Sequence, residues 1–363
     1  MKLRNIILAI SLIFVAFSCS MEDDTIMNDV ENGIAEESEM FTAINFGLTT
    51  SDMTTKSKTT VGAADSQDAD DKEMTVSSYD IFLLEDNNVI GIIRKGGDVL
   101  NKTSDGGITL KDSEFVTKYK EGRTITAYVV VNATTYGDTG ITDDPFSTIE
   151  IGSSKEAIEQ TEISDHLTAE SLVKVGETSF IIDGDFPKSK SVNVEGSKPI
   201  NVEVKHVAAR LEFSKFNVID EGGVIGENNL NVSPVTLLAA EFRNIQEKGQ
   251  LNGVGANEFS KKEINDFKAG QSPILTAYSY RNDGYEGQYV ELYIKFSVEY
   301  NGHAKEYEKT YVVNPKSDNK GSVLGGNLYK IVVDMTVSPK WVDANITLTT
   351  EDWVSHNLGE VDL

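Results

Sequence analysis

The chain has 363 residues, of which 58 are acidic and 33 basic, and a formal net charge of −25 at pH 7. A surface of this sign repels phosphate backbones and anionic lipid head groups, so the composition argues against nucleic acid as a partner. The length exceeds that of one ordinary β-sandwich and therefore predicts two domains.

The N-terminus has the pattern of a signal peptide followed by a lipid-attachment site. Lys2 and Arg4 precede an apolar run over 6–17, which is shorter than the roughly 20 residues that a membrane-spanning helix needs. Cys19, the only cysteine in the sequence, follows Ala-Phe-Ser as in a lipobox. We expect residues 1–18 to be removed and the Cys19 thiol to receive diacylglycerol, which anchors a soluble domain to a membrane.

The first strand signal is followed by a polar segment. Ile44, Phe46 and Leu48 alternate with polar residues or glycine, which predicts a half-buried strand. Residues 51–72 are rich in Thr, Ser, Asp and Lys, a composition typical of an exposed loop. Because exposed polar loops are preferred protease sites, Lys56 and Lys58 are candidate cleavage positions.

The first half of the chain continues mainly as strands. Residues 76–84 and 89–93 flank Glu-Asp-Asn-Asn, which predicts a hairpin. The apolar run Tyr-Val-Val-Val within 124–132 indicates a strand covered on both faces. Residues 153–175 have an irregular three-to-five spacing of apolar side chains, which predicts one or two short helices.

The second half gives the clearest alternation. Apolar residues occupy every other position over 290–300, and Asn301-Gly302 then turns the chain into 303–313, which predicts a hairpin. Further strands are expected at 200–204, 207–213, 329–337 and 344–350. We place the domain boundary within the Lys- and Ser-containing stretch 187–199. The predicted fold class is mainly β, with two β-sandwiches in tandem at 59–198 and 199–363.

The usual sequence signatures of catalysis and metal binding are absent. The four histidines are scattered, and the sequence has no second cysteine, no G-x-S-x-G and no phosphate-binding glycine motif. The acidic stretch that begins at Asp65 has Asp70 and Val76 where a calcium loop needs glycine and glutamate. We assign no catalytic residue, metal or cofactor. The sequence leaves open an enzyme that uses paired carboxylates, because the fold rather than the sequence spacing brings such acids together.

Five features occur in a characteristic order. They are the lipobox, the strand at 41–48 with basic residues after it, YVVVNA at 128–133, VAARLEF at 207–213 and ANITLTTEDW at 344–353. Each motif alone is weak, but their order resembles the fimbrillins, the FimA-type major subunits of type V pili, across essentially the whole chain.

The resemblance implies two transthyretin-like sandwiches and assembly by donor-strand exchange. In that family a lipoprotein precursor reaches the cell surface, and an extracellular trypsin-like protease cuts after a basic residue near the first strand. The strand leaves, and a C-terminal strand of the neighbouring subunit fills the groove. On this sequence the propeptide is 19–58, with Ile44, Phe46 and Leu48 on the removed strand and the cut after Lys58 or Lys56. The donor is Ala344 to Leu363, with Ile346, Leu348 and Trp353 as its large apolar residues.

One departure from the family concerns the cut. The best-known subunits are cut after arginine, whereas this sequence has no arginine between Arg4 and Arg94. The protease must therefore accept lysine or act elsewhere. The implied partners are copies of the chain, anchor and tip subunits, the protease, and the outer membrane through the lipid before processing. Two alternatives are a tip or accessory subunit, which need not donate a strand, and a glycan-binding surface lipoprotein that stays monomeric and retains residues 20–58.

Overall fold

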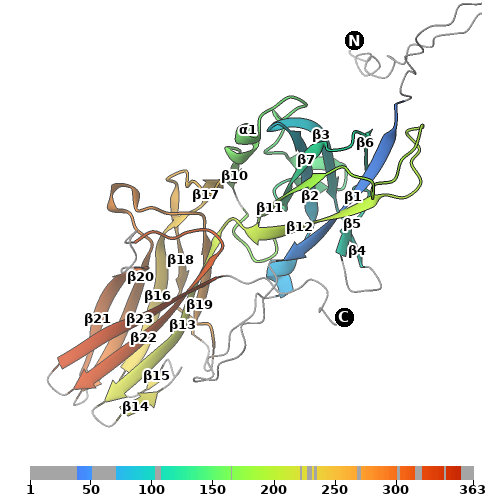
Figure 1. Cartoon of the computed structure of the whole chain (residues 1–363). Coiled ribbons are helices and arrows are strands. Elements are labelled where there is room, and N and C mark those ends of the chain that lie inside the picture. The colour runs from blue at the N-terminus through green and yellow to red at the C-terminus, as the bar shows by residue number, and fades with distance from the viewer. Residues whose placement is uncertain are drawn as a thin grey trace, which may run out of the picture. The chain divides into compact units, whose positions relative to one another are not determined.

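In the computed structural model of the chain, the regular elements of the described residues are almost all strands (Figure 1). It describes residues 39–50, 71–102, 108–164, 166–220, 223–226, 231–232, 235–267, 271–300, 303–314, 321–338 and 341–352. Within these ranges the helical elements are α1 (Lys155–Glu159) and the 3-10 turns η1 (Asp71–Met74) and η2 (Tyr285–Gly287). The mainly β fold class is confirmed. Among the described residues, no helix has the length and apolarity to cross a membrane.

The first sandwich is one nine-stranded sheet that folds over itself. Its order is β3-β2-β7-β11-β12-β1-β5-β4, and β6 also pairs with β1. The strands are β1 (Phe41–Thr50), β2 (Ser78–Glu85), β3 (Asn88–Gly96), β4 (Leu100–Lys102), β5 (Ile108–Leu110), β6 (Phe115–Lys118), β7 (Thr124–Val131), β11 (Lys174–Ile181) and β12 (Lys198–His206). Although β1 and β2 are four positions apart in the sheet, Ile44 and Ile81 belong to the same buried cluster. The sheet must therefore curve to enclose that cluster.

The hairpin and the strand covered on both faces that the sequence predicts in this half are confirmed. Asp86 and Asn87, between β2 and β3, have φ angles of 49° and 63°, as a two-residue hairpin turn requires. Val129 and Val130 on β7 are both fully buried but belong to different core clusters. The apolar run is thus explained by a strand covered on both faces.

The helical region is shorter than its sequence suggests. Of residues 153–175, α1 takes five, and β10 (Glu162–Ser164) follows it. Ile158, Ile163 and Leu172 still enter one buried cluster, although they do so from a helix, a short strand and a loop. Apolar spacing there reflects burial rather than a continuous helix.

The second sandwich consists of two five-stranded sheets. One has the order β14-β13-β22-β23 with β19 on β13, and the other has the order β15-β16-β20-β21 with β18 on β16. Their strands are β13 (Ala209–Asp220), β14 (Gly223–Gly226), β15 (Asn231–Val232), β16 (Val235–Gln246), β18 (Phe259–Ile264), β19 (Leu275–Ser279), β20 (Glu291–Tyr300), β21 (His303–Val312), β22 (Asn327–Ser338) and β23 (Trp341–Asp352). Phe213 and Ile331 of the first sheet share a core with Phe242 and Phe296 of the second. The predicted β20–β21 hairpin is confirmed.

The boundary between the sandwiches differs from the predicted one. β12 pairs with β1 and β11 in the first sheet, so the first sandwich extends to His206 rather than ending at 198. The next strand, β13, begins the second sandwich at Ala209. The alternation at Ile200, Val202 and Val204 marks a strand but carries no information about the sheet it joins, which is why the sequence placed the boundary too early.

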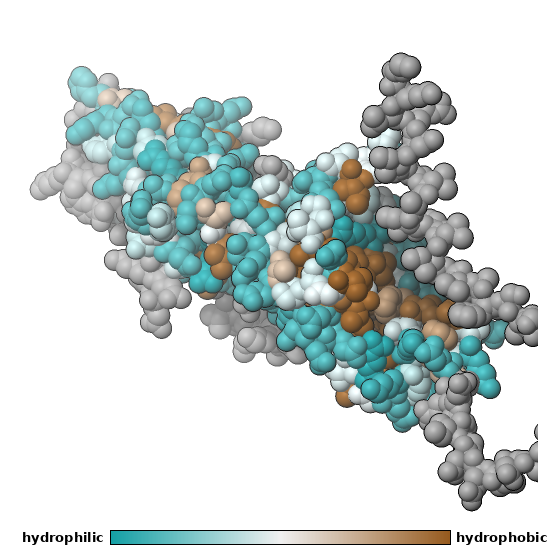
Figure 2. Space-filling model, turned by 90° about the horizontal axis from the view of Figure 1, so that it is seen from above, coloured by the Kyte–Doolittle hydropathy of each residue, from teal (hydrophilic) through white to brown (hydrophobic). Residues whose placement is uncertain are grey.

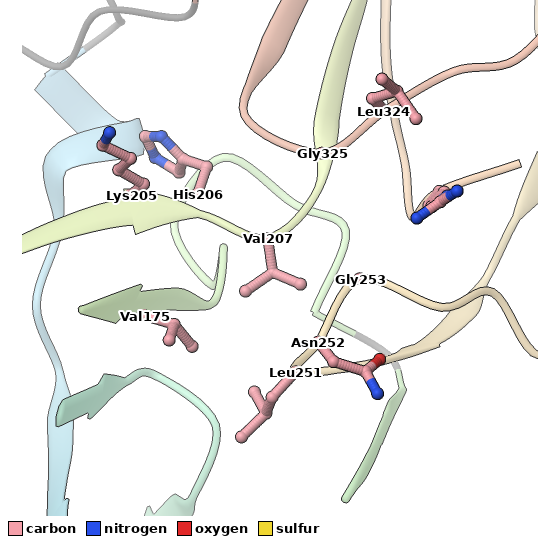
Figure 3. A pocket seen from close by; sticks show the side chains of 10 residues that line it. Val175, Lys205, His206, Val207, Leu251, Asn252, Gly253, Leu324 and Gly325 are labelled. Atoms are coloured by element: carbon pink, nitrogen blue, oxygen red, sulfur yellow. The ribbon is translucent and has the colours of Figure 1, made fainter. Parts of the chain in front are cut away.

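The junction between the sandwiches is closely packed. Val207 is buried with Leu251 and Leu328 in one cluster. A Cβ added at Gly325 would lie 2.0 Å from the Val207 carbonyl oxygen, so this approach requires glycine. Val207, Leu251 and Gly325 line a pocket of about 330 Å³, and Figure 3 shows how they lie around it. At this junction, β10 also pairs with β17 (Lys248–Gln250). A separate small pair, β8 (Thr135–Gly137) with β9 (Gly140–Asp143), lies in the first half of the chain.

One face of the described part of the chain is mostly polar (Figure 2). Figure 2 shows that hydrophilic residues cover most of one face, with hydrophobic residues gathered in one part of it. The edge strand β21 is exposed over most of its length and carries Lys305, Glu306, Glu308 and Lys309. Charges on an edge strand oppose pairing with another sheet.

Candidate functional site: the strand slot

β1 occupies a central position in the first sheet. It runs parallel to β12, from Ile44 opposite Lys198 to Thr50 opposite Val204. Its other edge is antiparallel to β6 over residues 41–44 and to β5 over residues 47–48. We call the position between β12 on one side and β5 and β6 on the other the strand slot.

The apolar face of β1 supplies part of the core. Ile44 and Phe46 are fully buried and Leu48 is 3% exposed. They share one cluster with Tyr79, Ile81, Leu83, Ile125, Val129, Val202 and Val204. Burying three side chains of this size stabilises a fold by about 5–9 kcal/mol, comparable with the 5–15 kcal/mol stability of a typical domain. An empty strand slot therefore removes much of the stability of the first sandwich.

Hydrogen bonds hold β1 at its start and its middle. The N–H of Phe41 donates to the Ser189 carbonyl at 2.7 Å, and the N–H of Tyr119 donates to the Met40 carbonyl at 2.7 Å. At the middle, the N–H of Phe46 donates to the Ser113 hydroxyl oxygen at 3.0 Å. These contacts act on main-chain atoms of β1 and of Met40 just before it, and they do not depend on side chains there.

β1 is also an imperfect occupant of the slot. The hydroxyl oxygen of Thr42 and the amide oxygen of Asn45 are buried and have no hydrogen-bond partner among the described residues. A buried polar atom without a partner costs about 1–3 kcal/mol. A strand with apolar residues at these positions would avoid that cost.

A buried ion cluster holds the segment that follows the predicted cut. Glu73 of η1 is fully buried, and its carboxylate accepts two hydrogen bonds from Arg210 of β13 at 2.9 Å each. The Tyr278 hydroxyl donates to the same carboxylate at 2.5 Å, and Arg210 also pairs with Glu212 at 3.1 Å. Since Glu73 lies downstream of Lys58, a cut there would leave η1 attached to the second sandwich.

Two titratable groups of the first sandwich lie beside this cluster. Burial lowers the pKa of Lys174 to about 7, although the nearby Glu73 carboxylate opposes the shift. The Lys174 ammonium lies 3.2 Å from the Thr75 carbonyl. Burial, with a smaller effect of Lys174, lowers the pKa of His206 to about 3, and its Nε2 lies 3.3 Å from the Glu73 carbonyl. His206 is therefore neutral near pH 7.

The Lys174 shift makes stability depend on pH. Between the folded pKa of about 7 and the usual value of 10.5, the unfolded chain binds a proton that the folded chain does not, so stability should rise with pH across this window. We expect Lys174→Met to flatten this rise, measured by urea unfolding at both ends of the window. The exposed Lys205→Met is the control and should leave the slope unchanged. If stability rises as steeply with pH in Lys174→Met as in the wild type, Lys174 is not the group responsible for the rise.

The structure describes only part of the set of site residues that the sequence suggested. Ile44, Phe46 and Leu48 lie together on the buried face of β1, whereas Cys19, Lys56, Lys58 and Trp353 lie outside the described residues. Ile346 and Leu348 lie on β23, opposite Val333 and Ile331 of β22. The expected donor segment thus pairs with its own domain up to Asp352, and its transfer to a neighbour stays a prediction.

Other features of the site have no sequence signal. Ser113 and Glu73 are single residues in no motif, and Arg210 lies within VAARLEF without any mark of an ion-pair role. Only the pairing of distant segments gives these residues a role. Among the described residues, no group of three or more His, Cys, Asp or Glu side chains could hold a metal ion.

Comparison with known proteins gives matches to solved structures. No family model and no curated protein matches the sequence. A protein assigned to cell adhesion from Bacteroides eggerthii superposes with a TM-score of 0.52 and 16% identity, covering 86% of this chain and 96% of that one. A second, from Parabacteroides distasonis, has a TM-score of 0.50 and 13% identity over 87% and 97% of the two chains. The chain shares its fold with these proteins. The expected architecture of two β-sandwiches in tandem is confirmed by the sheets and cores of the structure itself.

A fimbrillin from Porphyromonas gingivalis also matches. The FimA protein has a TM-score of 0.47 and 14% identity, over 87% of this chain and 98% of that one.

Proposed function

We propose that the chain is a pilin, a structural subunit of a cell-surface fimbrium that polymerises by protease-triggered donor-strand exchange and supports adhesion. The observation that carries the proposal is β1, a buried central strand joined to η1 through residues 51–70, which contain Lys56 and Lys58. One cut in this segment would leave β1 held by noncovalent contacts alone. The partners are copies of the chain, anchor and tip subunits, and a trypsin-like protease.

The energetics of the strand slot support exchange rather than simple loss. Departure of β1 would expose the apolar walls of the slot and two rows of unpaired main-chain groups. Such edges favour pairing with any suitable extended segment. The unpartnered polar atoms of Thr42 and Asn45 mean that a better-matched strand could bind more tightly than β1 does.

The position of β23 is compatible with donation. Among the described strands it pairs with β22 alone, whereas β1 is paired on both edges. Leaving its own sheet would break one ladder of hydrogen bonds rather than two. A strand of this kind could reach a neighbour without opening the centre of its own domain.

Blocking the cut tests the proposal directly. Lys56→Ala combined with Lys58→Ala should leave a folded, monomeric precursor, because β1 stays covalently attached and fills the slot. The measurement is N-terminal sequencing of the extracellular protein together with its size on an unboiled gel. The exposed pair Lys120→Ala and Lys190→Ala serves as control and should polymerise normally. Wild-type polymer that retains Phe41 would refute strand removal.

Lipid attachment is a separate expectation. Cys19→Ala should prevent lipidation and delay export, because no other thiol in the sequence can receive diacylglycerol. The measurement is incorporation of labelled fatty acid together with surface display on intact cells. Normal labelling of the variant would overturn the assignment of Cys19.

A further inference from the structure

The edge of the strand slot formed by β5 and β6 has a gap. β6 pairs with residues 41–44 of β1 and β5 with residues 47–48, so neither strand covers Phe46. The gap coincides with the turn from Lys111 to Glu114 that joins β5 to β6, in which Asp112 has a φ of 57°. Without another group here, the Phe46 N–H would be buried without a partner.

Ser113 fills this gap. Its hydroxyl oxygen accepts the Phe46 N–H at 3.0 Å and lies 2.9 Å from the Leu110 carbonyl and 3.4 Å from the Phe46 carbonyl. A serine hydroxyl has one proton and two acceptor sites, so it can accept from Phe46 while donating to Leu110. Ser113 is 1% exposed, which leaves little access for water to replace it.

The β1 atoms in these Ser113 hydrogen bonds belong to the main chain. We propose that Ser113 is a sequence-independent recognition residue of the strand slot, which binds the central N–H of whichever strand occupies it. The inference rests on the proposed function and specifies one requirement of the slot: an occupant needs a free N–H opposite Ser113. Both β1 before processing and the donated strand after assembly would make the same contact.

Peptide binding to the opened slot tests this role. In the full-length chain, a site-specific protease sequence placed between Thr50 and Asp71 allows a controlled nick. Labelled peptides of residues 39–50 and 344–363 are then exchanged against the nicked β1 fragment. Ser113→Ala should raise the Kd of both peptides by a similar factor, about tenfold, because the central N–H is left buried without a partner.

A control is available at a serine outside the strand slot. Ser179 of β11 is exposed, and its hydroxyl lies 2.8 Å from that of Thr126 on β7. Ser179→Ala should therefore leave both Kd values unchanged. An effect of Ser113→Ala no larger than that of Ser179→Ala would overturn the inference.

A backbone ester separates recognition from folding. Replacing the Phe46 amide of the 39–50 peptide by an ester removes the N–H with little change in shape. The ester should raise the Kd for the wild-type chain about tenfold. For the Ser113→Ala chain, the ester and the amide peptide should have nearly the same Kd, because the hydrogen bond is already lost. If Ser113→Ala does not fold, the Kd of the ester peptide for the wild-type chain is a sufficient test. A Kd equal to that of the amide peptide overturns the inference. If the 344–363 peptide fails to bind while the 39–50 peptide binds, the donor assignment fails but the Ser113 contact is still tested.

Discussion

Phe46→Ala should destabilise the precursor by about 3–5 kcal/mol and leave the assembled subunit unchanged. The loss is expected because Phe46 is fully buried in the core of the first sandwich, and truncation leaves a cavity. The assembled subunit should be insensitive because β1 is absent from it after exchange. The measurement is urea unfolding of the purified precursor, and thermal dissociation of polymer grown from the variant at low temperature.

The control for this prediction is a phenylalanine that stays in place. Phe216 is fully buried in the core of the second sandwich, so Phe216→Ala should weaken precursor and assembled subunit alike. Polymer destabilised equally by both substitutions would mean that β1 remains in the assembled subunit. The proposed strand removal would then be wrong.

Ile346→Asp combined with Leu348→Asp should give a processed monomer that cannot polymerise. In the donated position these residues would bring carboxylates into the apolar strand slot, and unpaired buried charges are strongly unfavourable. The expected result is a subunit cut at the normal position, with a normal melting temperature and no high-molecular-weight ladder on an unboiled gel.

The same substitutions distinguish donation from an intrinsic role. The main chain of β23 pairs with β22 over residues 341–352, so a lowered melting temperature of the monomer would assign Ile346 and Leu348 to their own sandwich. Thr347→Asp with Thr349→Asp is the matched control, because a strand alternates its faces and these residues would stay out of the slot when Ile346 and Leu348 enter it. That variant should polymerise.

The sequence by itself determined where several of the strands lie and which turns join two of the hairpins. The alternation over 290–300 and the Asn-Gly that follows it were sufficient for the β20–β21 hairpin, and the Asp-Asn turn was sufficient for β2–β3. The apolar run at 128–131 correctly indicated a strand covered on both faces. These features depend on side-chain periodicity and turn conformations, which act within a few residues of one another.

Tertiary structure alone decided which segments distant in the sequence meet. β1 lies parallel to β12, although Ile44 and Lys198 are far apart in the chain, and this pairing moved the domain boundary to His206. Ser113 has its role only because the gap between β5 and β6 lies opposite Phe46, which is 67 residues away in the sequence. Glu73 likewise pairs with Arg210 across a separation of 137 residues. Local periodicity specifies that a strand forms and which face is apolar. Its partner is selected by the packing of whole sheets around a shared core, and that selection depends on residues throughout the chain.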